Sequence, residues 1–229
     1  MKMRYAIYFV PGFDTALWRF GCSAIGYDAS SGDHVPLPRH PAYDYPDAHT
    51  WVSEPARYGF HATLKAPFEL ADGSAEHDLC EAAASFARQR TAFLVPALTV
   101  RLIGQFLALV PSEPSSRLNE LADNCVTVFE PFRAPLSAND LRRRLKAPLT
   151  PRQIKHLDRW GYPYVFDDFR FHMTLTGALD DAVSRQLKDV LDALYRSLAG
   201  PVPIDGIAIF RQDDRAGKFR VLERFQFSG

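Results

Sequence analysis

The sequence predicts an α+β protein in which two related lobes, each an antiparallel sheet with helices on its outside, face each other across a pseudo-twofold axis. The first observation is the pattern His-x-Thr-Leu, which occurs at residues 61–64 and again at 172–175. The second is the order of elements around each copy, since a motif strand, a helix and two further strands are predicted in both halves of the 229-residue chain. Each lobe is therefore expected to carry one His-x-Thr strand.

The first half opens with β-forming residues at 4–10, which predict a strand that ends at the Pro-Gly pair of residues 11 and 12. Asp14 is expected to cap the helix that follows. The stretch 26–57 contains five prolines and is predicted to be a long connection, which could act as a lid. The remaining elements expected here are the motif strand at 58–64, a helix over 73–90, and strands at 97–103 and 106–110.

A helical segment is expected to connect the two halves over about 112–159. Ser137 and Thr150 are suited to begin helices, since each is followed three residues later by a side chain that can complete a capping box. Seven basic residues lie in the second part of this segment: Arg142, Arg143, Arg144, Lys146, Arg152, Lys155 and Arg159. They are either a solvated helix face or a basic rim that attracts an anionic substrate.

In the second half the first pattern returns. The elements expected here are the motif strand at 169–176, a helix over 181–198, and strands at 204–211 and 219–227. We therefore expect a single domain over 1–229, with lobe one at about 1–111 and lobe two at about 160–229.

Composition excludes several classes of function. A hydrophobic content of 47% and a charged content of 24% are typical of a soluble globular protein. The net charge is zero, which argues against a broad electrostatic grip on duplex DNA. No apolar stretch is long enough to span a membrane or to form a signal peptide. The three cysteines, Cys22, Cys80 and Cys125, are scattered, which fits a reducing, cytoplasmic location.

The two motifs are the strongest candidates for chemistry. Successive side chains of a strand point to opposite faces, so His61 and Thr63 should share one face, and His172 and Thr174 should do the same. A core histidine bonded to its neighbours is the simpler interpretation of either copy alone. Because the pattern repeats, a shared site between the lobes is favoured.

Two imidazoles that converge on one cleft are suited to acid–base catalysis. With an ordinary pKa near 6.5, one histidine can be neutral and the other protonated at neutral pH. One would take a proton from water while the other protonates the leaving oxygen, and the threonine hydroxyls could donate to phosphate oxygens. The sequence offers no third ligand of the His-Glu-x-x-His kind, so no metal and no other cofactor is expected.

The two motifs and their flanks resemble the two-histidine (2H) phosphoesterase superfamily, which includes RNA 2',3'-cyclic phosphodiesterases and RNA-ligase-like proteins. The flanks at 58–68 and 169–177 are most similar to a subgroup of uncharacterised proteins associated with phosphonate-utilisation operons. The resemblance implies a bilobal α+β fold and the cleavage of a cyclic phosphodiester or a related phosphoester. It also implies that His61 and His172 are catalytic and that Thr63 and Thr174 bind phosphate.

Other residues near the motifs are weaker candidates for substrate contacts. By strand alternation, Lys65 and Arg170 lie on the faces of the histidines and could touch phosphate, or they could sit at strand ends in water. Tyr58 flanks the first motif, and Tyr162 could stack on a base or pack at the rim.

The expected partner is a small phosphorylated or cyclic-phosphate substrate or an RNA end, and neither duplex DNA nor a membrane. Candidate substrates are a 2',3'-cyclic nucleotide and a ribose cyclic phosphate from phosphonate metabolism. The alternative is a binding protein that holds a phosphorylated metabolite or RNA end without turnover.

Overall fold

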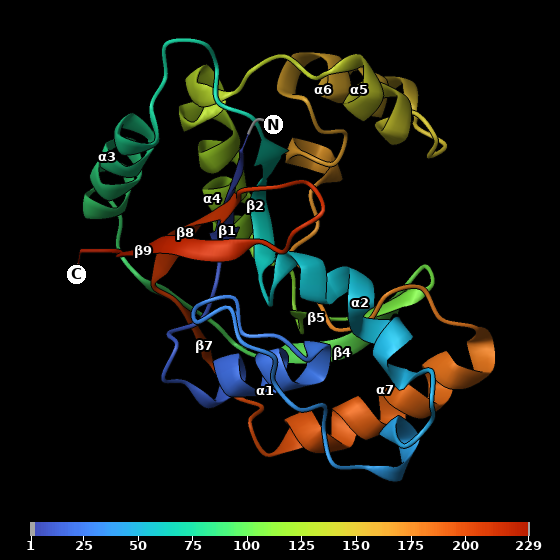
Figure 1. Ribbon diagram of the computed structural model, residues 1–229. Helices are drawn as coiled ribbons and strands as arrows, with labels where there is room; N and C mark the ends of the chain where they lie inside the picture. The colour runs from blue at the N-terminus through green and yellow to red at the C-terminus, as the bar shows by residue number, and fades with distance from the viewer. Residues whose placement is uncertain (1–2, 229) are drawn as a thin grey trace.

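A seven-stranded antiparallel sheet forms the centre of the molecule in the computed structural model, which describes residues 3–228 (Figure 1). Its strands are β1 (Arg4–Phe9), β2 (Ala62–Phe68), β4 (Leu98–Ile103), β5 (Phe106–Pro111), β6 (Met173–Thr174), β8 (Gly206–Gln212) and β9 (Arg220–Gln226). They lie in the order β4-β5-β6-β2-β1-β8-β9. Two short strands, β3 (Phe93–Val95) and β7 (Val202–Ile204), pair separately.

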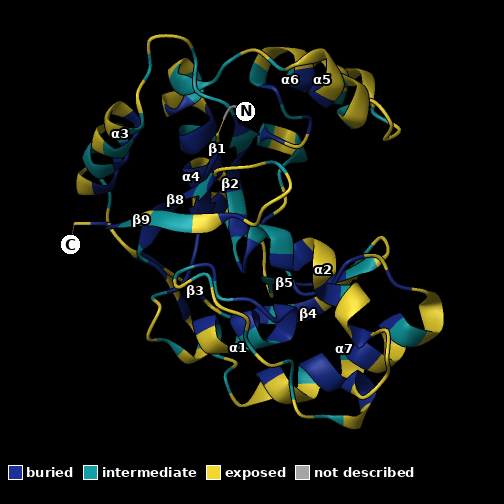
Figure 2. Cartoon of the chain, in the orientation of Figure 1, coloured by how far each residue is buried: buried dark blue, intermediate teal, exposed yellow. Residues whose placement is uncertain are grey.

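Helices cover the sheet, which confirms the predicted α+β class. They are α1 (Ala16–Ile25), α2 (Ala48–Tyr58), α3 (Glu76–Arg88), α4 (Ser116–Val128), α5 (Ala138–Arg144), α6 (Pro151–Trp160) and α7 (Asp181–Arg196). Short 3-10 turns lie at Pro41–Tyr43, Glu130–Phe132 and Phe166–Asp168. Helix α4 packs on β2, α3 on β8 and β9, and α7 on β4 and β5. Figure 2 shows that the strands are largely buried while α5 and α6 expose much of their surface.

The two motif segments lie side by side, because Ala62 of β2 pairs with Met173 of β6. Each hairpin of the sheet lies beside a strand from the other half of the chain: β5 pairs with β6, and β8 pairs with β1. The division into lobes at about 1–111 and 160–229 stays a prediction. The second motif strand is shorter than the predicted 169–176, since only Met173–Thr174 are extended and paired.

The expected long connection over 26–57 is wrong for its last part, which forms α2. Pro55 lies inside this helix and has no N–H to donate to the carbonyl of Trp51. The backbone N–H of Gly177 takes that place and donates to Trp51 O at 2.6 Å. A tertiary partner therefore satisfies the carbonyl that a proline would otherwise leave without its helical bond.

Helix caps agree with the sequence in two of three places. Ser137 accepts from Asp140 N at the start of α5, and Thr150 forms a capping box with Gln153 at the start of α6. The cap of α1 is Thr15 rather than Asp14, since the Thr15 hydroxyl accepts from Trp18 N. In the described part of the chain, none of the helices combines the length and apolar character needed to cross a membrane.

Candidate active site

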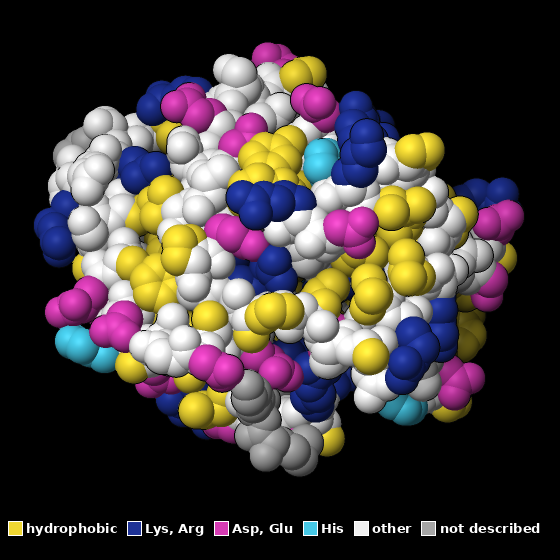
Figure 3. All heavy atoms as spheres, turned by 90° about the horizontal axis from the view of Figure 1, so that it is seen from above, with side chains coloured by type: hydrophobic (Ala, Val, Ile, Leu, Met, Phe, Trp, Pro, Cys, Tyr) yellow, Lys and Arg dark blue, Asp and Glu magenta, His cyan; other side chains and the backbone are white. Residues whose placement is uncertain are grey.

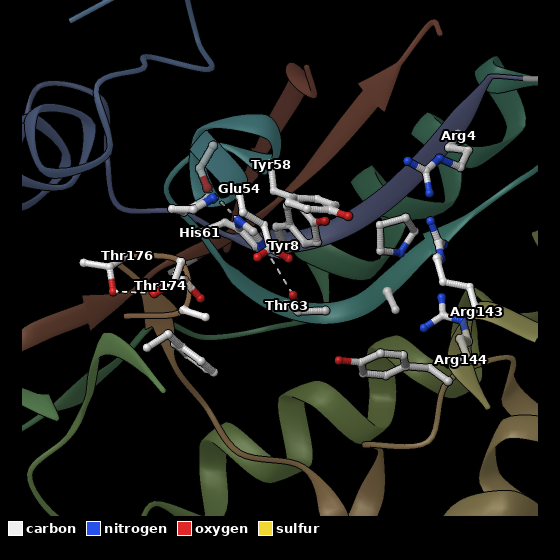
Figure 4. Close-up of a pocket in the computed structure, with 18 residues that line it drawn as sticks. Arg4, Tyr8, Glu54, Tyr58, His61, Thr63, Arg143, Arg144, Thr174 and Thr176 are labelled. Carbon is white, nitrogen blue, oxygen red and sulfur yellow. Dashed lines mark hydrogen bonds between the residues drawn. The ribbon is translucent and has the colours of Figure 1, made fainter. Parts of the chain in front are cut away.

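A pocket of about 500 Å³ lies where β1 and β2 meet the segment after β6. Helix α2 and the last turn of α5 complete its walls, so elements from four distant parts of the sequence line it (Figure 4). His61, Thr63 and Thr174 all line this pocket. His172 is two residues before Thr174 and is close enough to His61 to affect its pKa. Three of the four motif side chains therefore line one pocket, and His172, which is near His61, is not among the lining residues.

The two imidazoles are held in the same way. His61 Nδ1 lies 2.8 Å from the carbonyl oxygen of Gly59, and His172 Nδ1 lies 2.8 Å from the carbonyl oxygen of Arg170. A carbonyl can only accept, so each bond requires the proton on Nδ1 and leaves Nε2 with its lone pair when the ring is neutral. Both histidines thus carry a lone pair on Nε2, and both are fixed by the carbonyl two residues earlier in the sequence.

His61 is the more enclosed of the two. Its ring stacks on Tyr8, with centroids 3.6 Å apart and planes 17° apart. Its Nε2 lies 3.1 Å from Thr63 Oγ1, and since Nδ1 carries the proton, the hydroxyl donates. Burial lowers the pKa of His61 to about 3; the Gly59 carbonyl opposes this shift and His172 adds to it. The ring is therefore neutral near pH 7.

His172 packs beside Phe106, with ring centroids 5.8 Å apart. Burial lowers its pKa as well, and the bond to the Arg170 carbonyl works against that shift. Both imidazoles are thus biased towards the neutral form. A phosphate anion close to the rings would favour the charged form. Binding of an anion would therefore favour protonation of one histidine, as the proposed acid–base pair requires.

Tyr58 and Tyr162 also line the pocket. Tyr58 stacks on Phe219, with centroids 5.5 Å apart, and Arg144 lies over the ring of Tyr162 at 4.9 Å. Both phenol groups are therefore placed where a substrate could contact them.

Lys65 does not reach the pocket. Tyr8 of β1 pairs with Thr63 and Ile7 pairs with Lys65, so one step on β1 spans two residues of β2. This bulge breaks the alternation that placed Lys65 beside the motif side chains. The Lys65 ammonium instead donates to Glu130 at 2.8 Å and to the carbonyl of Val126 at 2.9 Å. Its position is structural, beneath α4.

Arg170 is also directed elsewhere. Its side chain is exposed and lines a separate hollow beside the start of α4. Only its backbone carbonyl serves the site, through the bond from His172 Nδ1.

The basic segment divides between the two interpretations left open by the sequence. Arg143 and Arg144 line the pocket, whereas Arg152 pairs with Asp168 at 2.8 Å. On the face seen in Figure 3, Lys and Arg side chains are interspersed with Asp and Glu rather than gathered in one basic patch. Within residues 3–228, no group of three or more His, Cys, Asp or Glu could hold a metal ion.

The model of a protein family described as "Protein of unknown function (DUF1045)" matches residues 63–220, more than half of the chain. The chain belongs to the DUF1045 family. The matched part contains the whole second motif and Thr63 of the first.

Two curated relatives of this DUF1045 chain are named ribose 1,5-bisphosphate phosphokinase PhnN. The one from Janthinobacterium sp. (strain Marseille) is 36% identical over 231 residues, which cover 99% of this chain and 51% of that protein. The one from Laribacter hongkongensis (strain HLHK9) is 34% identical over 224 residues, which cover 96% and 50%. The chain spans about half the length of the curated relatives it matches.

Solved structures with a similar fold share little sequence with the DUF1045 chain. A crystal structure titled as a phosphoesterase has a TM-score of 0.44 and 13% identity, over 99% of both chains. E. coli LigT complexed with 3'-AMP has a TM-score of 0.49 and 12% identity, over 100% of both chains.

Sequence reasoning missed several side chains of the DUF1045 pocket. Tyr8 and Arg4 come from β1, and a charge within an otherwise apolar strand was the available signal for Arg4. Glu54 lines the pocket from α2, in the stretch predicted to be a loop. Thr176 lines it too, but its hydroxyl accepts from Leu107 N at 2.9 Å and therefore helps to hold the segment after β6 in place.

Proposed function

We propose that this chain is a phosphoesterase that opens a cyclic phosphodiester by acid–base catalysis between His61 and His172. The observation that carries the proposal is the matched pair of Nδ1–carbonyl bonds, which leaves the Nε2 lone pair of each ring for proton transfer. His61 lines the pocket, and His172 lies close enough to His61 to affect its pKa. A pair of imidazoles fixed in the same tautomer is suited to proton transfer on opposite sides of a phosphorus centre.

In the proposed reaction His61 is the base and His172 is the acid. Burial keeps His61 neutral, so its Nε2 can take a proton from the attacking water. The water oxygen forms a bond to phosphorus as the bond to one ring oxygen breaks. His172, protonated once the anionic substrate is bound, gives the proton on its Nε2 to that leaving oxygen. The product is a phosphomonoester with a free hydroxyl.

The threonines are proposed to hold the non-bridging oxygens. In the structure the Thr63 hydroxyl donates to His61 Nε2 at 3.1 Å. Rotation of this hydroxyl towards a phosphate oxygen would both stabilise the developing charge and release Nε2 for the water. Thr174 lines the same pocket and is proposed to act on the phosphate in the same way.

The proposed substrate is a small phosphorylated sugar or nucleotide, with a ribose cyclic phosphate of phosphonate metabolism as the first candidate. The name of the curated relatives, which refers to ribose 1,5-bisphosphate, supports a phosphorylated ribose over an RNA end. We place the reaction in the cytoplasm, where the three cysteines, which are free among the described residues, would stay reduced.

A second candidate function is phosphoryl transfer, because the relatives are named as kinases. That activity belongs to proteins of about twice the length, and the present sequence contains no G-x-x-x-x-G-K-[ST] motif. Incubation with ribose 1,5-bisphosphate and ATP tests it directly, since a kinase would release ADP.

The decisive experiment offers a panel of cyclic phosphodiesters to the protein in the presence of EDTA. We expect ring opening that falls by at least about 100-fold in His61→Ala and in His172→Ala. His77→Ala is the matched control, since His77 is an exposed histidine of α3 paired with Glu81. Full activity in both motif variants would overturn the proposal. Tight binding of the panel without any product would favour the binding protein instead.

A further inference from the structure

The end of the pocket away from the histidines is strongly basic. Arg4, Arg143 and Arg144 line it together, and Figure 4 shows them gathered opposite His61 and Thr174. Among the described residues that line the pocket the only acid is Glu54, which Figure 4 places beside His61. The two ends of one pocket therefore differ in charge and in chemistry.

Two of these guanidinium groups have no carboxylate partner among the residues that the structure describes. Arg4 is 4% exposed and donates to Gln212 Oε1, a neutral acceptor. Arg144 is half-buried, lies over the Tyr162 ring, and has a buried Nε without a hydrogen-bond partner. A guanidinium withdrawn from water costs free energy unless an acceptor replaces the lost solvent.

The nearest acids are already engaged. Asp140 accepts from both Nη1 and Nη2 of Arg215, at 2.8 and 2.7 Å, and from Arg143 at 3.0 Å. Glu69 accepts from the same Arg215 at 2.6 Å. Asp140 and Glu69 thus bond Arg143 and Arg215, and the positive charges of Arg4 and Arg144 remain at the pocket without a carboxylate among the described residues.

We infer that this basic end is a second anion subsite, which binds a phosphomonoester carried by the same substrate whose cyclic phosphodiester lies between the histidines. The inference deepens the proposed function and rests on it. Arginine suits this task because its planar group donates two parallel hydrogen bonds to phosphate oxygens. The substrate class is therefore a sugar-sized cyclic phosphodiester with a second, dianionic phosphate at its other end.

The kinetic test compares adenosine 2',3'-cyclic phosphate with the same compound phosphorylated at O5'. We expect kcat/KM to favour the phosphorylated compound by at least about tenfold, the effect of one charge-assisted hydrogen bond. In Arg144→Gln the ratio of the two kcat/KM values should fall towards one. Arg144→Lys keeps the charge but not the two parallel N–H donors, and should recover part of the ratio. Arg142→Gln should keep the full ratio, because Arg142 is exposed on the same helix, is bonded to Asn139 and lies outside the pocket. Equal kcat/KM for the two compounds in the wild type, or a full ratio in Arg144→Gln, would overturn the inference.

Binding separates this inference from the proposed function. Calorimetry with adenosine 3',5'-bisphosphate and adenosine 3'-monophosphate should show the same tenfold or greater advantage for the bisphosphate, on the order expected for a charged pair, and its loss in Arg144→Gln. An Arg144-dependent advantage without turnover of any cyclic compound would leave the subsite standing and refute the phosphoesterase. Turnover of a cyclic compound without any binding advantage for the bisphosphate would refute the subsite and leave the phosphoesterase standing.

Added inorganic phosphate distinguishes a subsite that binds the phosphate of the substrate from one that binds a free anion. If the subsite takes the phosphate of the substrate, added phosphate should reduce the preference by competition. If it takes a free anion, added phosphate should instead raise kcat/KM for the unphosphorylated compound, and that result would overturn the inference.

Discussion

The backbone N–H of Gly177 lies 2.6 Å from the carbonyl oxygen of Trp51, the carbonyl that Pro55 cannot serve within α2. This bond joins the segment that follows Thr174 to the helix that carries Tyr58 into the pocket. Two walls of the site, far apart in the sequence, are therefore fixed to each other by the backbone.

The first prediction concerns this bond. The Gly177 amide should exchange with solvent as slowly as amides of the central strands, because a carbonyl of a packed helix holds it. Hydrogen exchange followed by NMR measures this directly. An exchange rate equal to that of an exposed loop amide would show that the two walls separate freely.

The second prediction concerns stability against pH. The pKa of His61 is about 3 in the folded protein, below the ordinary value near 6.5 of the unfolded chain. Between these values the unfolded chain binds a proton that the folded protein does not, so the free energy of unfolding falls as the pH falls from 6.5 towards 3. The slope from this residue is at most about 1.4 kcal/mol per pH unit.

Urea titrations at pH 6.5 and 4.5 check this contribution by comparing the wild type with His61→Asn. The variant should lose less stability across the interval, while His77→Ala, which alters an exposed histidine, should follow the wild type. Parallel losses in wild type and His61→Asn would mean that His61 takes up its proton in the folded state.

The third prediction separates a structural role of Lys65 from a substrate contact. Lys65→Met removes the buried ammonium that bonds Glu130 and the Val126 carbonyl. Glu130 keeps its bonds to Arg133, so we expect a loss of about 1–3 kcal/mol in the free energy of unfolding. KM at a temperature where the variant is folded should change little. A raised KM with unchanged stability would instead indicate that Lys65 contacts the substrate.

The fourth prediction concerns the two threonine hydroxyls. Thr63→Val and Thr174→Val keep the shape of the side chain and remove the donor, and each should lower kcat/KM by about 100-fold. Thr63→Ser, which retains a hydroxyl, should stay within about tenfold of the wild type. Steady-state kinetics on a cleaved cyclic phosphodiester measures all three. Valine variants as active as the serine variant would show that the threonine hydroxyls do not contribute to catalysis.

The sequence was informative where structure depends on local pattern. The repeated His-x-Thr predicted that two motif strands come together, and Ala62 does pair with Met173. The helix start at Thr150 followed from a capping box that spans only four residues. In both cases the interactions that decide the outcome lie within a short stretch or within a repeated one.

What the sequence could not supply depends on distant partners. The bulge that turns Lys65 away arises from its register with β1, which strand alternation alone does not reveal. The prolines of 26–57, among them Pro55, predicted a connection instead of α2, because Gly177, which bonds the carbonyl that Pro55 cannot serve, lies far along the chain. The basic end of the pocket likewise needs Arg4 and Arg144, which only the folded chain brings together.

Each hairpin of the sheet pairs with a strand from the other half of the chain, and this arrangement affects how the protein folds. Strand β1 is flanked on one side by β8, and Arg4 bonds Gln212 across a separation of 208 residues. Such pairings close very long loops, which slows folding relative to a protein of mainly local contacts. During synthesis, the edge of the apolar strand β1 that pairs with β8 would stay unpaired until β8 had left the ribosome. We therefore expect a fragment that ends before β8 to aggregate rather than to fold, and chaperone capture of the nascent chain to be most prolonged in that interval.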